Sequence, residues 1–201
     1  MESVLNQTYD NFELIIVNDG STDNSLAIAS SYKDGRIQII DKKNGGVSSA
    51  RNAGIRAAKN EYIIPFDADD LWDKRCLDEF VYLIQNFPKA EVFCTSYTID
   101  PKKNNHSKKR YYVPNYYLTS AVSMAKWNMP IMVTGCVCIA QQCFDKIGMY
   151  NEKLKHGEDY DLWMRLKDGF LIAKSDTVTL HYRLDAENRA TDRKSTRLNT
   201  S

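Results

Sequence analysis

The sequence lacks long hydrophobic runs and has almost no net charge. No apolar stretch approaches the roughly 20 residues of a transmembrane helix, and residues 1–7 lack the basic and apolar parts of a signal peptide. Lysine plus arginine, 27, nearly balances aspartate plus glutamate, 26, so no overall positive field favours nucleic acid. We therefore expect a soluble, cytoplasmic protein that does not bind nucleic acid.

Cysteine pairs with the spacing of a disulfide framework are also missing. The five cysteines form an odd set without paired spacing, which favours a reducing compartment. Cys136 and Cys138 are separated by one residue, a gap too short for the usual zinc-binding pair. In a strand their side chains would point to the same face, so we predict buried apolar thiols.

Charge is distributed unevenly along the chain, although its sum is near zero. One basic stretch contains Lys102, Lys103, His106, Lys108, Lys109 and Arg110. We interpret it as a solvated loop. The alternative is a surface for an acidic acceptor or for a membrane, with the protein bound peripherally at the inner face.

Strands and helices are predicted to alternate along the first third of the chain. Short runs of branched apolar residues predict strands, and capped segments with helical periodicity lie between them. The expected strands are 12–17, 36–40 and 61–66, and the expected helices are 25–32 and 48–59. This alternation predicts a parallel sheet wrapped by helices, in which ligands bind at the carboxyl ends of the strands.

The remaining chain is predicted to complete a single domain. A helix is expected at the N-terminus over 2–7, and later helices over 74–86, 116–127, 141–147 and 157–167. Further strands are expected over 90–98, 133–140, 170–174 and 177–183. No linker rich in glycine, serine or proline divides the chain, so we predict one domain over 1–184 and a tail over 185–201.

An acidic cluster, Asp67-Ala68-Asp69-Asp70, directly follows the third predicted strand. Carboxylates repel one another, so this crowding costs stability unless a cation or hydrogen-bond donors neutralise it. Mg²⁺ and Mn²⁺ favour one or two carboxylates together with diphosphate oxygens, and such an ion stabilises a departing nucleoside diphosphate. The alternative is an ordinary helix N-cap, because aspartates favour the positive end of a helix.

Three further polar segments lie at predicted turns between strands and helices. Asp19 lies just after the first strand, where its carboxylate can accept hydrogen bonds from the ring N–H of a base. Arg51 follows the loop 44–46, whose glycines let the backbone approach a ligand, and it can reach a phosphate or a base carbonyl. Glu158 and Asp159 begin a late helix, and a charged aspartate facing a cleft can deprotonate an acceptor hydroxyl. Each segment also has a purely structural alternative. Asp19 could serve only to form a turn, Arg51 could be a solvated helix residue, and Glu158 and Asp159 could serve only to cap their helix.

Together, the four segments resemble the family 2 glycosyltransferases of the GT-A fold, from Met1 to about Arg183. The resemblance implies an α/β fold with a mostly parallel central sheet flanked by helices, and Mg²⁺ or Mn²⁺ as cofactor. It also implies that Asp19 and Arg51 contact the nucleobase, normally uracil, and that Asp67 lies near the ribose and diphosphate. By the same resemblance, Asp69 would hold the metal and Asp159 would be the catalytic base. Glu158 and Trp163 would shape the acceptor and sugar pocket.

The activity implied by the resemblance is inverting glycosyl transfer. Such an enzyme moves a sugar from a nucleotide-diphosphate donor, here expected to be a UDP-sugar, to a glycan or lipid-linked acceptor in cell-surface polysaccharide biosynthesis. Family members invert the anomeric centre in one displacement and need no enzyme nucleophile, unlike retaining glycosidases. The alternatives are an inactive or nucleotide-binding-only fragment, and a sugar-nucleotide nucleotidyltransferase. The latter is expected to carry a glycine-rich, basic loop after its first strand, and this sequence has none.

Both ends of the chain depart from the family pattern. The family begins with a strand of the type Ile-Ile-Ile-Pro-Thr-Tyr-Asn followed by a helix, and this chain begins inside that helix. We therefore expect the domain over 1–184 to be incomplete at its N-terminus, with neighbouring strands short of a partner. Residues 185–201 resemble no part of the family, and we expect this tail not to be native to the enzyme.

Overall fold

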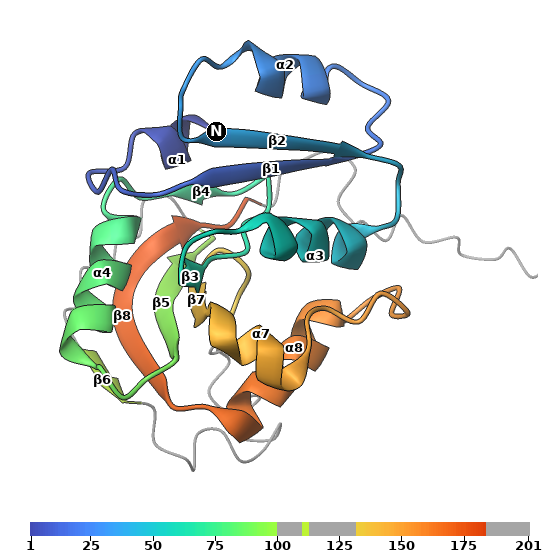
Figure 1. The fold of residues 1–201 in the computed structure, drawn as a ribbon. Helices are drawn as coiled ribbons and strands as arrows, with labels where there is room; N and C mark the ends of the chain where they lie inside the picture. The colour runs from blue at the N-terminus through green and yellow to red at the C-terminus, as the bar shows by residue number, and fades with distance from the viewer. Residues whose placement is uncertain (100–109, 113–131, 184–201) are drawn as a thin grey trace, which may run out of the picture.

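The computed structural model describes residues 1–99, 110–112 and 132–183, which form an α/β domain with strands in two sheets (Figure 1). The first sheet pairs β1 (Leu14–Asp19) with β2 (Ile37–Lys42) in parallel, from Leu14 opposite Ile37 to Asp19 opposite Lys42. Helices α2 (Ser25–Ser31) and α3 (Val47–Ala57) lie on opposite sides of this pair (Figure 1). The predicted strand–helix alternation is thus confirmed in this part of the chain.

The second sheet contains six strands in the order β3-β7-β5-β8-β4, with β6 paired to β8. Their bounds are Tyr62–Ile63 for β3, Leu71–Trp72 for β4, Val92–Thr98 for β5, Arg110–Tyr112 for β6, Val137–Ala140 for β7 and Ile172–His181 for β8. Only β5 and β8 run parallel in this sheet. The expected parallel arrangement therefore holds for the two longest ladders, β1–β2 and β5–β8, whereas β3, β4, β6 and β7 pair antiparallel. Apolar runs predict that strands are buried but not in which direction they pair.

The six-stranded sheet separates two hydrophobic cores because successive side chains of a strand point to opposite faces. In β5, Val92 and Cys94 contribute to one core and Phe93 to the other. Helices α7 (Gln141–Ile147) and α8 (Glu158–Gly169) pack on the first core, and α4 (Cys76–Asn86) packs on the second, with the short α1 (Glu2–Leu5) beside it. This packing fixes α8, which carries three predicted site residues, against the sheet.

The cysteines behave as the sequence predicts. All five are unpaired and buried, and Cys136 and Cys138 lie in the same core. Burial raises the pKa of Cys94 and Cys136 to about 12, so these thiols stay protonated at neutral pH. They are packing residues rather than ligands or nucleophiles.

Parts of the second sheet differ from the prediction. The strands expected over 170–174 and 177–183 form one continuous strand, β8, which pairs with β5, β4 and β6. The strand expected over 61–66 has only two ladder residues, because Pro65 has no N–H to donate and its carbonyl accepts instead from Gly135 at 2.7 Å. Strand β6 was not predicted, since Arg110 was read as part of a basic loop. The helix expected over 116–127 and most of the basic stretch, 102–109, lie outside the described residues.

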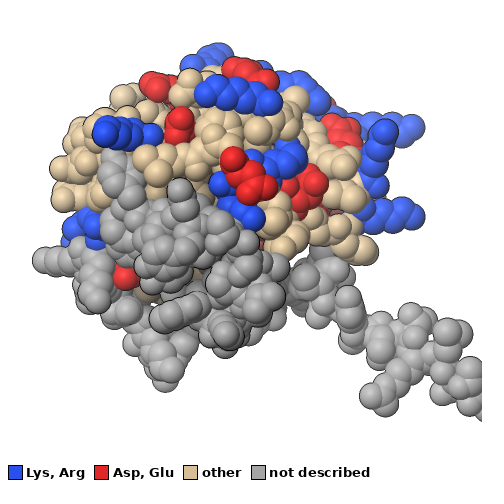
Figure 2. Space-filling model, turned by 90° about the horizontal axis from the view of Figure 1, so that it is seen from below, with Lys and Arg blue, Asp and Glu red and all other residues tan. Residues whose placement is uncertain are grey.

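The surface agrees with the near-zero net charge. In Figure 2, acidic and basic side chains lie next to one another on the visible face. Within the described part of the chain, no helix is long and apolar enough to cross a membrane.

Candidate active site

Asp19, the last residue of β1, holds the loop that leads into α3. Its carboxylate accepts hydrogen bonds from the backbone N–H groups of Gly45 at 3.0 Å and Gly46 at 2.8 Å. It also accepts one from the ammonium group of Lys42. Burial raises the pKa of Asp19, but Lys42 and the two N–H groups outweigh burial and leave the pKa below its usual value. The carboxylate is therefore charged and engaged within the protein.

The two glycines of this loop are required by local geometry. Gly46 has φ +86°, a conformation that L side chains rarely adopt. A Cβ at Gly45 would lie 2.7 Å from Oγ of Ser49. In this structure the glycines let the loop close onto Asp19, and their predicted approach to a ligand stays a prediction.

Arg51 joins three segments that are far apart in the sequence. From α3, its guanidinium donates to Oδ1 of Asp67 at 2.7 Å and to Oε1 of Glu158 at 2.9 Å. Burial lowers the pKa of Arg51, but the two carboxylates outweigh burial and raise the pKa above its usual range. The side chain is only 14% exposed, and it remains a cation that is paired with both acids. The structure thus brings three predicted site residues into direct contact.

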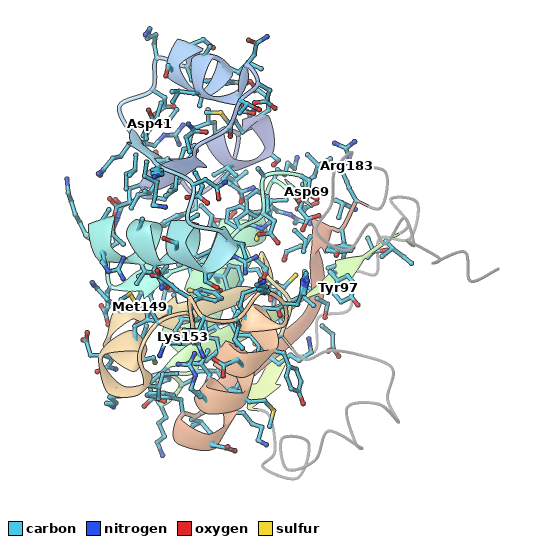
Figure 3. The ribbon with its side chains drawn as sticks, turned by 90° about the vertical axis from the view of Figure 1, so that its right-hand side faces the viewer. Asp41, Asp69, Tyr97, Met149, Lys153 and Arg183 are labelled. Carbon is cyan, nitrogen blue, oxygen red and sulfur yellow. The ribbon has the colours of Figure 1, made fainter. Side chains whose placement is uncertain are left out.

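The acidic cluster forms a tight turn between β3 and β4. The N–H of Asp70 donates to the carbonyl of Asp67 at 3.2 Å, and the buried carboxylate of Asp70 accepts from the backbone N–H of Arg183 at 3.1 Å. Asp67 and Asp69 are partly exposed on this turn. Figure 3 shows Asp69 and Arg183 on the same side of the molecule, with Tyr97 further along that side. The end of β8 therefore anchors the turn that carries the predicted metal residue.

The first turn of α8 carries the predicted catalytic base. Asp159 is partly exposed and accepts a hydrogen bond from the N–H of Tyr160 at 2.7 Å. Its neighbour Glu158 points to Arg51 instead, so the two acids contact different groups. Trp163, predicted to line the pocket, is 6% exposed and lies in the core beneath the site.

Two residues that the sequence analysis missed, Asn52 and Tyr150, form the floor of this site. The Asn52 amide donates to the carbonyl of Tyr150 at 2.9 Å and accepts from its N–H at 2.9 Å. The Tyr150 ring lies against Trp163, with 6.5 Å between ring centroids, and the guanidinium carbon of Arg51 lies 5.2 Å from the Tyr150 centroid. An asparagine next to Arg51 on a predicted helix rich in alanine was the available signal.

The acidic turn fits a divalent cation only in part. The described residues contain no group of three or more His, Cys, Asp or Glu side chains that could hold a metal by themselves. Mg²⁺ is commonly held by one or two carboxylates plus substrate phosphates, so a cage of protein ligands is not required. Nδ1 of His181 is buried with no hydrogen-bond partner in the described ranges, and His181 pairs with Leu71, directly after the turn. The turn thus supplies one or two carboxylates, and a bound diphosphate would have to complete the coordination.

Comparison with known proteins agrees with this fold. The model of glycosyl transferase family 2 matches residues 1–148. An uncharacterised glycosyltransferase of Rickettsia typhi is 35% identical over 171 residues, which cover 82% of this chain and 52% of the relative. The chondroitin synthase of Pasteurella multocida is 29% identical over 174 residues, covering 84% of this chain and 17% of the synthase.

Solved structures show the same fold. Residues 1–349 of TarS from S. aureus, in a crystal structure with UDP-GlcNAc, superpose with a TM-score of 0.76 at 19% identity, covering 95% of this chain and 55% of TarS 1–349. The chain belongs to glycosyl transferase family 2 and has the GT-A fold. It spans about half the length of the Rickettsia typhi relative.

Proposed function

We propose that this chain carries the donor-binding and catalytic part of an inverting glycosyltransferase that uses a UDP-sugar. The observation that carries the proposal is the contact of Arg51 with both Asp67 and Glu158. The Arg51 guanidinium thus connects the acidic turn, which we assign to the diphosphate, with α8, which carries the proposed base. A nucleotide-binding fold alone would not require these two acidic segments to meet.

The proposed reaction is a single displacement at the anomeric carbon. Asp159 takes the proton of the acceptor hydroxyl as the new C–O bond forms and the bond from the sugar to the diphosphate breaks. Asp159 is suited to this because it is partly exposed at a helix N-terminus, where the dipole favours a charged carboxylate. Glu158 is held by Arg51, and we assign it to positioning rather than to proton transfer.

Donor binding is assigned to the edge where β1, α3 and the acidic turn meet. Asp19 and Arg51 would contact the base, Asp67 would lie near the ribose and diphosphate, and Asp69 would hold Mg²⁺ or Mn²⁺. Such an ion supplies positive charge that stabilises the departing diphosphate. Trp163, buried beneath the site, would support the acceptor and sugar pocket through Tyr150.

The substrates are proposed from the relatives. TarS has been solved with UDP and with UDP-GlcNAc, which supports a UDP-sugar donor. Relatives named chondroitin synthase and hyaluronan synthase support a glycan acceptor, with a lipid-linked glycan as the alternative, in cell-surface polysaccharide synthesis. The cytoplasmic location at the inner face of the membrane stays a prediction.

Titration of UDP by calorimetry, with and without Mn²⁺, tests the proposal. We expect binding that strengthens at least tenfold with Mn²⁺, and loss of this dependence in Asp69→Asn. A matched control is Asp168→Asn, because Asp168 is an exposed residue at the far end of α8. Absence of Mn²⁺-dependent binding in the unsubstituted chain would contradict the proposal.

The alternative of a protein that binds nucleotide without catalysis is tested by turnover. Release of UDP from a UDP-sugar is measured for the unsubstituted chain and for Asp159→Asn. Catalysis through Asp159 predicts at least a hundredfold loss of turnover with unchanged UDP affinity. Metal-dependent UDP binding without any turnover would favour the binding-only alternative, and equal turnover by both proteins would exclude Asp159 as the base.

A further inference from the structure

The hydroxyl of Tyr150 is buried without a hydrogen-bond partner among the described residues. Tyr150 is 3% exposed, so water does not replace the missing partner. A buried hydroxyl that makes no hydrogen bond costs stability, and a phenylalanine would fill the same space without that cost. Unsatisfied polar groups of this kind are expected mainly where function requires them.

The protein fixes this side chain in place. Asn52 bonds to both the N–H and the carbonyl of Tyr150, and it donates to Oε1 of Glu152 at 2.8 Å as well. Trp163 packs edge-on against the ring from α8. Because backbone and ring are both held, the hydroxyl cannot rotate away to find a partner elsewhere. Its position is therefore set by the fold.

The charged residues of the candidate site surround this tyrosine. The guanidinium carbon of Arg51 lies 5.2 Å from the ring centroid. Burial raises the pKa of Tyr150, Arg51 lowers it, and the charges of Asp67, Asp159 and Glu158 raise it further, so the phenol keeps its proton at neutral pH. The residue thus offers one hydrogen-bond donor between the acidic turn and the first turn of α8.

We propose that the Tyr150 hydroxyl donates a hydrogen bond to the bound nucleotide-sugar and that Arg51 covers it until the ligand binds. The inference rests on the proposed function. Arg51 lies over the face of the ring, and movement of its guanidinium from the two carboxylates toward a ligand would open that face. The acceptor is an oxygen of the diphosphate or of the transferred sugar, since both are rich in lone pairs.

Tyr150→Phe tests the proposal because it removes only the hydroxyl. We expect the free protein to unfold at the same or a higher temperature, while its affinity for UDP-GlcNAc in the presence of Mn²⁺ falls about two- to tenfold, as for the loss of one hydrogen bond. Tyr82→Phe is the matched control, because Tyr82 is 43% exposed on α4 and should leave both quantities unchanged. A residue with only a structural role would not combine equal stability with weaker binding.

Measuring the affinity of Tyr150→Phe for UDP and for UDP-GlcNAc shows whether the hydroxyl bonds to an oxygen of the diphosphate or of the sugar. Equal weakening for both ligands supports the diphosphate, and weakening confined to UDP-GlcNAc supports the sugar. Unchanged affinity of Tyr150→Phe for both ligands overturns the inference, as does a lower unfolding temperature, which would reveal a partner inside the protein. If the unsubstituted protein binds neither ligand with Mn²⁺, the proposed function itself fails, an outcome distinct from equal binding by the two proteins.

Discussion

The guanidinium of Arg51 lies 2.7 Å from the carboxylate of Asp67, sixteen residues further along the chain. The contact connects α3 to the acidic turn, and a second bond from the same group reaches Glu158 on α8 at 2.9 Å. One buried cation therefore holds both acidic segments of the candidate site. A ligand that recruits Arg51 must compete with two carboxylates, so ligand binding and the geometry of the site are coupled.

Arg51→Met should destabilise the protein by about 2 kcal/mol in denaturant unfolding. Removing one partner of a buried ion pair leaves uncompensated charge, which costs about 3–5 kcal/mol when burial is complete. The value is lower here because Asp67 is 36% exposed. Arg56→Met is the control on the same helix, since Arg56 is 57% exposed and its 3.5 Å pair with Glu152 should contribute less than about 0.5 kcal/mol. Equal losses in the two variants would contradict a central role for Arg51.

Asn52→Leu should cost about 3 kcal/mol of unfolding free energy. The side chain is 2% exposed and makes three hydrogen bonds, two to the backbone of Tyr150 and one to Glu152. Each bond contributes about 1 kcal/mol, and its loss leaves buried backbone groups unpaired. Asn86→Leu removes a single exposed bond, to the carbonyl of Tyr82, and should cost under about 1 kcal/mol. A loss below that of the Asn86 variant would show that Asn52 does not hold the site floor.

Asp19→Asn should change how stability depends on pH. The pKa of Asp19 in the folded protein is lower than its usual value of 3.8, so the charged carboxylate stabilises the fold above that pH. This stabilisation disappears as the pH falls through the folded-state pKa. We therefore expect the unsubstituted protein to be about 1 kcal/mol more stable than Asp19→Asn at pH 7, with the difference closing at lower pH. A difference that stays constant between pH 7 and pH 3 would exclude this linkage.

An added N-terminal strand should stabilise the domain. Among the described residues, β1 pairs only with β2, and β3 pairs only with β7. The apolar residues Leu14 to Val17 of β1 are only partly buried, unlike a central strand of an α/β sheet. We expect an extension with a strand of the type Ile-Ile-Ile-Pro-Thr-Tyr-Asn to raise the unfolding free energy by at least about 2 kcal/mol, the contribution of one more large buried apolar side chain.

The control for that experiment is an extension of equal length made of glycine and serine. Such a segment has little apolar surface to bury and should leave stability unchanged. If both extensions have the same effect, the edges of β1 and β3 do not accept a further strand.

Local patterns were sufficient to predict most individual elements of this protein. Helix caps and apolar periodicity predicted α2, α3, α4, α7 and α8 within a few residues, because these signals depend on neighbours along the chain. The combination of four polar segments predicted the family, which the match over 1–148 confirms. The strand directions in the second sheet were not predictable in this way, because pairing depends on partners distant in the sequence.

The sequence by itself determined which residues could form the site: Asp19, Asp67, Asp69, Glu158 and Asp159 lie after predicted strands or at the start of a predicted helix, and Arg51 lies on a predicted helix. Only the tertiary structure decided how they meet. It joined Arg51 to Asp67 and Glu158 and placed Trp163 in the core. It also placed the buried ring of Tyr150 against Arg51. The physical reason is that ion pairs and burial depend on separations in space, which the packing of α3 and α8 against the sheets sets and the chain order does not.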